Sequence, residues 1–358
     1  MSDGRNIDSR LGTLSGEGSQ QRGATEVVPW KALDTSGYGV PGDRTYYDRP
    51  VIKKSVWSWD IPAYYYVGGA TGSAMALGAA ATLINRDRLS RLVLQSRVVG
   101  LAGSMVSAYF LVHDLGRPER FLNMMRVFRP TSPMSVGAWI LFFFSGSAGV
   151  AAISQLGPRW IRRIGDASAV ISGVFGLGLS GYTGVLVSNT TVPVWQRPHR
   201  LMPALFLSSG VSGAASVFDL LGGNPREQRA VLLFGTAGKL AELSFAYLME
   251  RSVATVPEAA RPLEDGLSGF LWKAAKVLTA ASLLIALVPN SSARVRRISG
   301  VLGSLGSLCT RFGVHYAGQR SAMNPRATFQ QQRGGQGAYA VTGRAAVTGP
   351  GDARAVLE

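Results

Sequence analysis

Long apolar stretches alternate with short polar connections through the middle of the chain. Eight such stretches lie at about 61–84, 93–113, 134–156, 167–187, 201–221, 230–249, 267–288 and 298–318. A helix of about 20 apolar residues crosses the roughly 30 Å hydrocarbon core of a bilayer. The connections are short and rich in Pro, Gly and Arg, which favours antiparallel neighbouring helices. The pattern predicts an all-α integral membrane protein with about eight transmembrane helices.

The two ends of the chain differ from this middle part. Residues 1–59 are polar, of mixed charge and without the apolar core of a signal peptide, so they predict a flexible tail that becomes ordered near Trp57 and Trp59. Residues 321–358 have no apolar period and predict a disordered C-terminal tail. The predicted membrane domain therefore covers residues 60–320.

A weak internal echo suggests a repeat. The second stretch ends in Phe110-Leu-Val-His-Asp-Leu-Gly116, and the fifth ends in Val217-Phe-Asp-Leu-Leu-Gly-Gly223. Two four-helix bundles related by pseudo-symmetry would explain this likeness. Chance similarity between two glycine-rich apolar helices explains it equally well.

The charge pattern indicates membrane topology. The formal net charge is +16, but only 16% of residues are charged, against roughly 25% in soluble domains. The arginines are spread over short loops, which fits contact with anionic membrane lipids and argues against a nucleic-acid-binding stripe. The loops after stretches one, three, five and seven carry slightly more arginine than the others. This bias predicts a multi-pass protein of the cell membrane with both termini outside.

The sequence offers few ligands for a redox centre. Cys309 is the single cysteine, and the histidines are His113, His199 and His315. An iron–sulfur cluster held by cysteines of this chain is therefore excluded, and the positions of the histidines argue against a bis-histidine haem. If the protein handles electrons, we expect the redox centre to belong to a partner.

The second apolar stretch ends in an unusual group of ionisable residues. His113 and Asp114 lie at the expected membrane boundary, and Arg117 and Pro118 follow directly. Ionisable groups at this depth are costly unless they are paired or used, so proton or quinone chemistry is one interpretation. An Asp114–Arg117 ion pair that anchors the helix end is the other.

Aromatic residues gather on the same predicted membrane face. If the helices are antiparallel, this face carries Tyr64, Tyr65, Arg117, Tyr182 and Trp195 beside His113 and Asp114. An aromatic pocket with a few polar groups suits a flat apolar ligand such as a quinone, and Asp, His and Tyr can exchange protons with its oxygens. An aromatic belt at the bilayer interface is the alternative interpretation.

Further charges lie within the later stretches. Lys239 and Glu242 share a helix face, and together with Asp219 they predict a proton path or, equally, a buried ion pair that fixes packing. We expect Lys273 and Lys276 to extend to the lipid headgroups.

Several of these motifs resemble the NrfD-like family, which includes the membrane subunit of polysulfide reductase. The likeness covers roughly residues 57–290. Its motifs are Trp59-x-x-Pro62, Tyr66-Val-Gly-Gly69, Asp114-Leu-Gly-Arg-Pro118 with Arg120-Phe121, Pro133-Met-Ser-x-Gly-x-Trp139, Tyr182-Thr-Gly184 followed by Ser188, and Gly238-Lys-Leu-x-Glu242. At the start of the first stretch the sequence has tyrosines where some family members use Asn and His.

The resemblance implies eight membrane helices, no haem or iron–sulfur cluster in this chain, and a quinone site near the face where an iron–sulfur subunit docks. Tyr182 then matches the quinone-contacting tyrosine, and Asp114 and Arg117 match the adjacent acidic–basic element. The expected substrate is a quinone, either menaquinone or ubiquinone. The expected partners are an iron–sulfur electron-transfer subunit and a catalytic subunit, with a molybdopterin enzyme as the candidate. A cofactor-free membrane anchor or proton conduit for such an oxidoreductase, and a secondary transporter, are the competing predictions.

Overall fold

The computed structural model describes residues 6–8, 13–15, 50–289 and 291–333. In the first 46 residues, β1 (Asn6–Asp8) and β2 (Thr13–Ser15) form a short antiparallel pair with Ile7 opposite Leu14. The rest of the predicted N-terminal tail up to residue 49 lies outside the described residues.

The described residues from 50 onward are almost entirely helical. Eight long helices follow one another: α1 (Asp60–Asn85), α2 (Ser90–His113), α3 (Pro133–Ile153), α4 (Arg159–Ser188), α6 (Met202–Leu221), α7 (Pro225–Ala254), α9 (Gly266–Ala286) and α10 (Ala293–Met323). Shorter helical segments connect or extend them: η5 (Pro118–Met125), η6 (Ser154–Leu156), α5 (Pro193–Gln196), α8 (Pro257–Glu264) and α11 (Pro325–Arg333). The eight long helices coincide with the eight predicted stretches.

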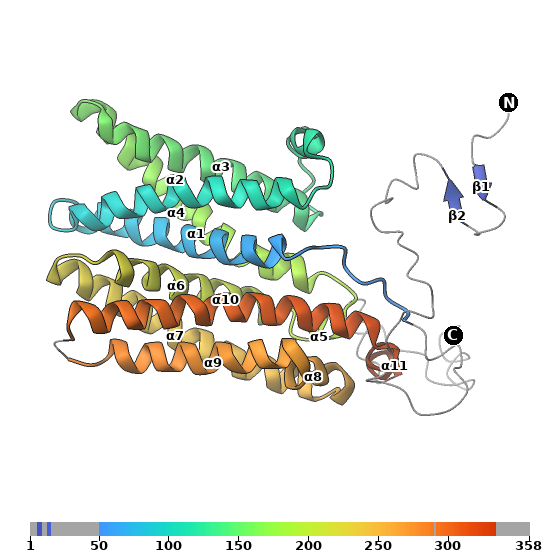
Figure 1. The fold of residues 1–358 in the computed structure, drawn as a ribbon. Helices are drawn as coiled ribbons and strands as arrows, with labels where there is room; N and C mark the ends of the chain where they lie inside the picture. Colours follow the sequence, from blue (N-terminus) through green and yellow to red (C-terminus); the bar gives the residue numbers. More distant parts are fainter. Residues whose placement is uncertain (1–5, 9–12, 16–49, 290, 334–358) are drawn as a thin grey trace, which may run out of the picture. The chain divides into compact units, whose positions relative to one another are not determined.

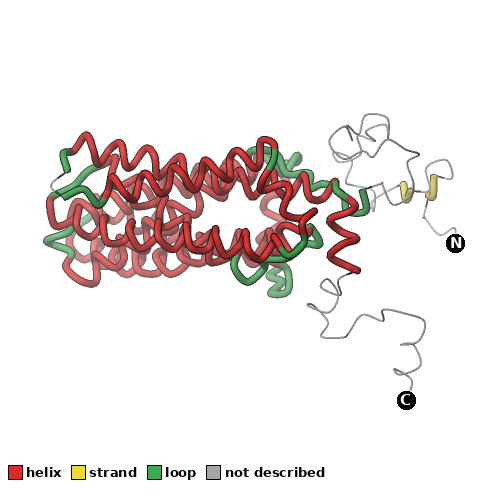
Figure 2. The backbone as a smooth tube through the Cα atoms, turned by 90° about the horizontal axis from the view of Figure 1, so that it is seen from below, coloured by secondary structure: helices red, strands yellow, loops and turns green. Residues whose placement is uncertain are grey.

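The long helices pack as two four-helix bundles, which confirms that prediction (Figure 1). In the first bundle α1 packs on α2 and α4, and α3 closes the ring between them. In the second bundle α6 packs on α7 and α10, and α9 closes the ring. Contacts of α6 with α1 and α4, and of α10 with α1, join the two bundles. Figure 2 shows the helices lying lengthwise together with the connections gathered at their ends.

We call the end of the bundles where α1, α3, α6 and α9 begin the proximal end, and we call the opposite end the distal end.

The two bundles correspond helix for helix, α1 with α6, α2 with α7, α3 with α9 and α4 with α10. Matching residues support this order: Pro62-Ala-x5-Gly69-x-x-Gly72 with Pro203-Ala-x5-Gly210-x-x-Gly213, Ala108-Tyr109 with Ala246-Tyr247, Ser135 and Trp139 with Ser268 and Trp272, and Ser172-Gly-Val-x-Gly176 with Ser299-Gly-Val-x-Gly303. The predicted echo was therefore placed wrongly, because Asp114 follows α2 at the proximal end whereas Asp219 ends α6 at the distal end.

Glycine brings the central helices close together. A methyl group on Gly72 of α1 would overlap the carbonyl oxygen of Gly176 on α4. A methyl group on Gly210 of α6 would lie 2.8 Å from the carbonyl oxygen of Gly69 of α1. Small residues allow such backbone approach, which is the usual way for membrane helices to gain packing contacts. The high glycine content therefore has a specific use at the α1 interfaces.

Six of the eight long helices are long and apolar enough to cross a membrane. The helices that fall short are α2, which contains Arg91 and Arg97, and α10, which contains Arg311 among other arginines. The chain is thus a multi-pass membrane protein by its helices, and the number of eight spans stays a prediction.

The C-terminal boundary also differs from the prediction. Residues 321–333, expected to belong to a disordered tail, complete α10 and form α11. Asn324 connects the two helices, and its amide donates to Glu258 of α8 at 3.0 Å. Gln331 of α11 is hydrogen-bonded to Gln196 of α5. Polar contacts of this kind leave no apolar period in the sequence, so the pattern did not reveal them. Residues 334–358 lie outside the described part.

Candidate functional site at the proximal end

A cavity of about 60 Å³ lies at the proximal end of the first bundle. Helices α1, α2, α3 and α4 each contribute to it, as do the residues after α2. Its lining is mostly aromatic and aliphatic: Trp57, Ile61, Tyr64, Tyr65, Leu111, Asp114, Leu115, Met124, Met134, Ala138, Tyr182 and Leu186. Four of the predicted site residues, Tyr64, Tyr65, Asp114 and Tyr182, thus meet in one cavity.

The wall from α3 depends on how that helix begins. Ser132 accepts a hydrogen bond from the backbone N–H of Ser135, and Pro133 occupies the first helical turn, where its missing N–H costs nothing. This start places Met134 and Ala138 on the cavity wall.

Three tyrosine hydroxyls form the polar part of the cavity. Tyr64 of α1 and Tyr182 of α4 are hydrogen-bonded through their hydroxyls. The hydroxyl of Tyr65 is buried and has no hydrogen-bond partner among the described residues. A buried hydroxyl without a partner is costly, so a ligand oxygen or a water molecule at this point would be stabilising.

Asp114 is held at the cavity by residues that precede α1. Both the backbone N–H and the hydroxyl of Ser58 donate to its Oδ1, at 3.0 and 2.8 Å. The described residues contain no ion pair between Asp114 and Arg117. His113 instead pairs with Asp60, with 3.1 Å between Nδ1 and Oδ2. The anchoring interpretation based on an Asp114–Arg117 pair is therefore wrong.

A second polar group lies inside the second bundle. Glu242 of α7 accepts a hydrogen bond from the hydroxyl of Thr310 at 2.8 Å, and both side chains are buried. Arg311 of α10 donates to the carbonyl oxygen of Phe206 at 2.5 Å and lies 4.1 Å from the centre of that ring. Arg311 interacts electrostatically with Glu242 and with Tyr65, a residue of the cavity lining.

Lys239 and Asp219 extend this group toward the distal end. Lys239 is buried and interacts electrostatically with both Asp219 and Glu242. Asp219 also interacts with Arg296 at the start of α10, and both line a small distal cavity. The three residues predicted for a proton path therefore do lie near one another, although within the described residues no ion pair joins Lys239 to Glu242.

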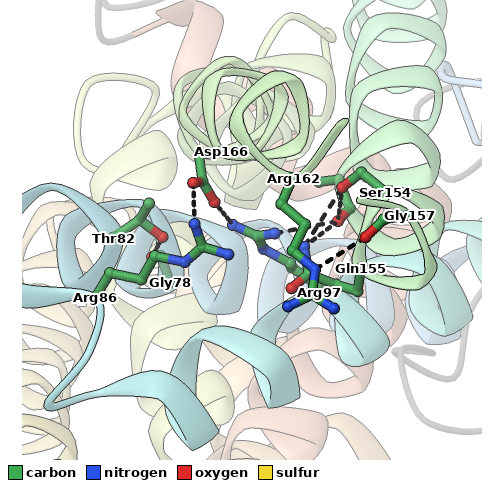
Figure 3. A network of polar contacts seen from close by, with 10 residues as sticks. Gly78, Thr82, Arg86, Arg97, Ser154, Gln155, Gly157, Arg162 and Asp166 are labelled. Atoms are coloured by element: carbon green, nitrogen blue, oxygen red, sulfur yellow. Dashed lines mark hydrogen bonds and ion pairs between the residues drawn. The ribbon is translucent and has the colours of Figure 1, made fainter. Parts of the chain in front are cut away.

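A separate network holds the distal end of the first bundle together (Figure 3). Arg97 of α2 is fully buried and donates to Asp166 of α4 at 2.5 Å, while Arg86 pairs with the other oxygen of Asp166. Arg97 also donates to the carbonyl oxygen of Ala151 at 3.3 Å. These bonds join α1, α2, α3 and α4, and they give Arg97 a structural role.

Some predicted site residues lie away from the cavity. Trp195 is buried, but its indole N–H donates to the carbonyl oxygen of Val314 at 2.8 Å, and its ring stacks on Trp57. Arg117 is exposed directly before η5, outside the cavity lining. His113 is exposed and likewise outside the lining.

The two lysines of α9 have specific contacts. Lys276 pairs with Glu250 of α7, and Lys273 donates to the carbonyl oxygen of Glu264 at 2.8 Å. Both lysines thus make proximal-end contacts within the protein, rather than only reaching the headgroups.

Sequence reasoning missed Arg311 and Ser58 as parts of this region. Arg311 interrupts an apolar helix, and an intramembrane charge is itself a signal of function. Ser58 carries no comparable signal, because its contact with Asp114 depends on how the backbone enters α1.

Comparison with known proteins places this arrangement in a family. Residues 50–322 match the family described as polysulphide reductase, NrfD. Protein NrfD of Escherichia coli is 28% identical over 189 residues, which cover 45% of this chain and 58% of that protein. The C subunit of polysulfide reductase from Wolinella succinogenes is 23% identical over 314 residues, which cover 74% of this chain and 94% of that protein. The match to the family covers both bundles and the cavity, and the chain belongs to the polysulphide reductase, NrfD family.

Proposed function

We propose that the protein is the quinone- or quinol-reactive membrane subunit of an oxidoreductase complex. The observation that supports this best is the unpartnered Tyr65 hydroxyl beside the Tyr64–Tyr182 pair and Asp114, all in one aromatic cavity of the described residues. Oxidation of a quinol to a quinone releases two electrons and two protons, and reduction consumes them. The electrons pass to or from an iron–sulfur cluster of the partner, and the protons pass through side chains of this protein.

The side chains that line the cavity are suited to binding a quinone and transferring its protons. The hydroxyls of Tyr65 and Tyr182 can hydrogen-bond ring oxygens, and Asp114 can accept or donate a proton at the cavity wall. The cavity volume of about 60 Å³ holds roughly four water molecules, at about 15 Å³ each. To admit a quinone ring, the cavity must therefore enlarge by movement of one of its walls, and any water in it must be displaced. Met124 and Met134 form part of that wall, and unbranched methionine side chains repack readily.

The partners follow from the chemistry. The relative from Wolinella is named as one component of polysulfide reductase. We infer an iron–sulfur subunit that docks at the proximal end, near the cavity, and a catalytic subunit of molybdopterin type beyond it. Menaquinone and ubiquinone would both present ring oxygens to these hydroxyl groups. The slight arginine excess in the distal loops supports a cell-membrane orientation with the proximal end and both termini outside.

Quinone analysis of the purified complex tests this function. Lipids extracted from wild type are compared with those from Tyr182→Phe and Asp114→Asn, with Tyr247→Phe and Asp87→Asn as controls at exposed positions. We expect stoichiometric quinone in wild type and both controls, and its loss from the two site variants. Asp114→Asn should also abolish electron transfer while assembly persists.

The opposite outcome has a defined meaning. A complex that assembles normally and contains no quinone in any sample overturns the proposal and favours the cofactor-free anchor. Unchanged electron transfer in Asp114→Asn excludes the proton role of that residue alone.

We propose in addition that protons move through the second bundle. Arg311, Glu242, Lys239 and Asp219 form a series from beside Tyr65 to the distal cavity, linked by electrostatic interactions. Intramembrane ionisable residues in such a series are typical of proton relays. Oxidation or reduction of quinone at the proximal end would then be coupled to proton movement to or from the distal end.

A further inference from the structure

Four polar residues connect the cavity to the protein surface at the proximal end. The order is His113, Asp60, Ser58 and Asp114. The successive distances are 3.1 Å from His113 Nδ1 to Asp60 Oδ2, 2.6 Å from Asp60 Oδ2 to Ser58 Oγ, and 2.8 Å from Ser58 Oγ to Asp114 Oδ1. All three lie within hydrogen-bond range, so the series is continuous.

The two ends of this series have different surroundings. The His113 side chain is 55% exposed, and its ring stacks on Tyr109 with 5.7 Å between ring centres. Asp114 lines the cavity, and it interacts electrostatically with Tyr65. Between them the Asp60 side chain is only 4% exposed, whereas Ser58 is exposed. The series thus meets solvent at His113 and at Ser58, and it ends where the ligand is proposed to bind.

The Ser58 hydroxyl bridges two carboxyl groups. Its oxygen lies within hydrogen-bond distance of a carboxyl oxygen of Asp60 on one side and of Asp114 on the other. A hydroxyl group can donate one hydrogen bond and accept others. Ser58 is therefore placed to pass a proton between the two carboxyl groups.

One oxygen of Asp60 contacts both His113 and Ser58, while the other is buried and unused by these contacts. Asp60 lies in the first turn of α1, where an acidic side chain favours the helix dipole even when exposed. Here its Oδ1 is buried and has no hydrogen-bond partner in the described part of the protein. A buried carboxyl oxygen without a partner is costly, which is expected where the group must gain and lose a proton.

We infer that His113, Asp60 and Ser58 are positioning and relay residues that carry protons between Asp114 in the cavity and the proximal surface. Asp114 accepts a proton from the ligand and passes one on through Ser58 and Asp60 to His113, which releases it to water. Reduction of the ligand runs the same transfers inward. This inference rests on the proposed quinone function. It also changes the predicted role of His113, which acts at the surface and not in the cavity.

The test measures turnover with a water-soluble quinone or quinol by the purified complex. The variants are Asp60→Asn, Ser58→Ala and His113→Ala, and His199→Ala is the matched control because it is an exposed histidine at the same end. We expect Asp60→Asn and His113→Ala to turn over at least about tenfold more slowly, since direct proton transfer contributes roughly 10²–10⁴-fold. Bound quinone should stay at the wild-type amount.

Two readouts separate a relay from a merely structural role. Imidazole added to the buffer should restore much of the rate of His113→Ala, and should leave His199→Ala unchanged. The solvent isotope effect on turnover should rise in Asp60→Asn, because proton transfer becomes limiting. Tyr109 faces the relay by stacking on His113, and Tyr65 faces it through an electrostatic interaction with Asp114.

The outcomes distinguish the two proposals. Wild-type turnover in both Asp60→Asn and His113→Ala, with quinone present, overturns the relay and leaves the quinone function intact. Slow turnover without imidazole rescue and without a change in isotope effect also overturns it. Absence of quinone and of turnover in wild type overturns the quinone function, and the relay with it.

Discussion

The proximal ends of the two bundles share a helix order but differ in content. In the first bundle, Tyr65 and Tyr182 surround a cavity. In the second, the corresponding positions on α6 and α10 hold Phe206 and Cys309, and Phe206 is fully buried. The rings of Tyr65 and Phe206 meet across the bundle interface, 5.8 Å apart. At these positions, hydroxyl groups are thus present in the bundle that contains the cavity and absent from the other.

The same comparison explains the position of Arg311. Its counterpart in the first bundle is Gly184, where an added methyl group would lie 2.6 Å from the carbonyl oxygen of Met202. No side chain fits there. In the second bundle Arg311 faces Gly69 of α1, where an added methyl group would lie 2.9 Å from its guanidinium group. Glycine therefore permits close packing in one half and a buried arginine in the other. One scaffold thus contains a hydroxyl-lined cavity in the first bundle and a charged interior in the second.

The substitution with the largest expected effect lies in the charged interior of the second bundle. Glu242→Gln keeps the hydrogen bond with Thr310 but removes the negative charge near Arg311. We expect proton transfer across proteoliposomes to fall by at least about tenfold, since a group that cannot ionise cannot relay protons. A pH-sensitive dye inside the vesicles measures this during quinone turnover.

Glu264→Gln, at an exposed position in α8, is the control for this variant. Stability is followed in parallel, because an uncompensated buried Arg311 costs on the order of 3 kcal/mol. Equal proton transfer in wild type and Glu242→Gln, in a folded protein, would exclude the path through the second bundle.

A second, smaller difference between the two bundles is expected at two corresponding glycines, Gly72 of α1 and Gly213 of α6. An alanine at Gly72 would overlap the backbone of Gly176, whereas at Gly213 the new methyl group would lie 3.3 Å from Ala70 Cβ, a contact that a small shift relieves. We expect Gly72→Ala to destabilise the protein by about 1–3 kcal/mol through overpacking. Gly213→Ala should be nearly neutral, because alanine's helix preference of about 1 kcal/mol offsets the shift. Thermal unfolding in detergent measures both, and equal midpoints would contradict the difference between the α1 and α6 interfaces.

The sequence was sufficient for the helices and for most of the cavity. Apolar stretches end at Pro, Gly and Arg, and antiparallel order then brings Tyr64, Asp114 and Tyr182 to one end. It was insufficient where one long-range contact decides a side chain's position. Trp195 belongs to the same end, yet its N–H bonds the carbonyl oxygen of Val314 on α10.

Two corresponding tryptophans give the smallest contrast. Trp272 of α9 is buried, and its indole N–H donates to Glu250 at 2.5 Å. Trp139 of α3, at the matching position, has a buried indole N–H without a partner in the described residues, and its ring contacts Phe128 and other aromatic rings.

Phenylalanine at each position removes the N–H and keeps an aromatic ring. Trp272→Phe should lower the free energy of unfolding by about 1 kcal/mol from the lost hydrogen bond, a value at the low end because Glu250 is partly exposed. Trp139→Phe loses no hydrogen bond, so only the smaller ring counts against it. The difference between the two variants, measured by denaturant or heat, therefore reports the Trp272–Glu250 bond. If Trp139→Phe were the more damaging of the two, its N–H would have a partner in the membrane-embedded complex, such as a lipid or the adjoining subunit.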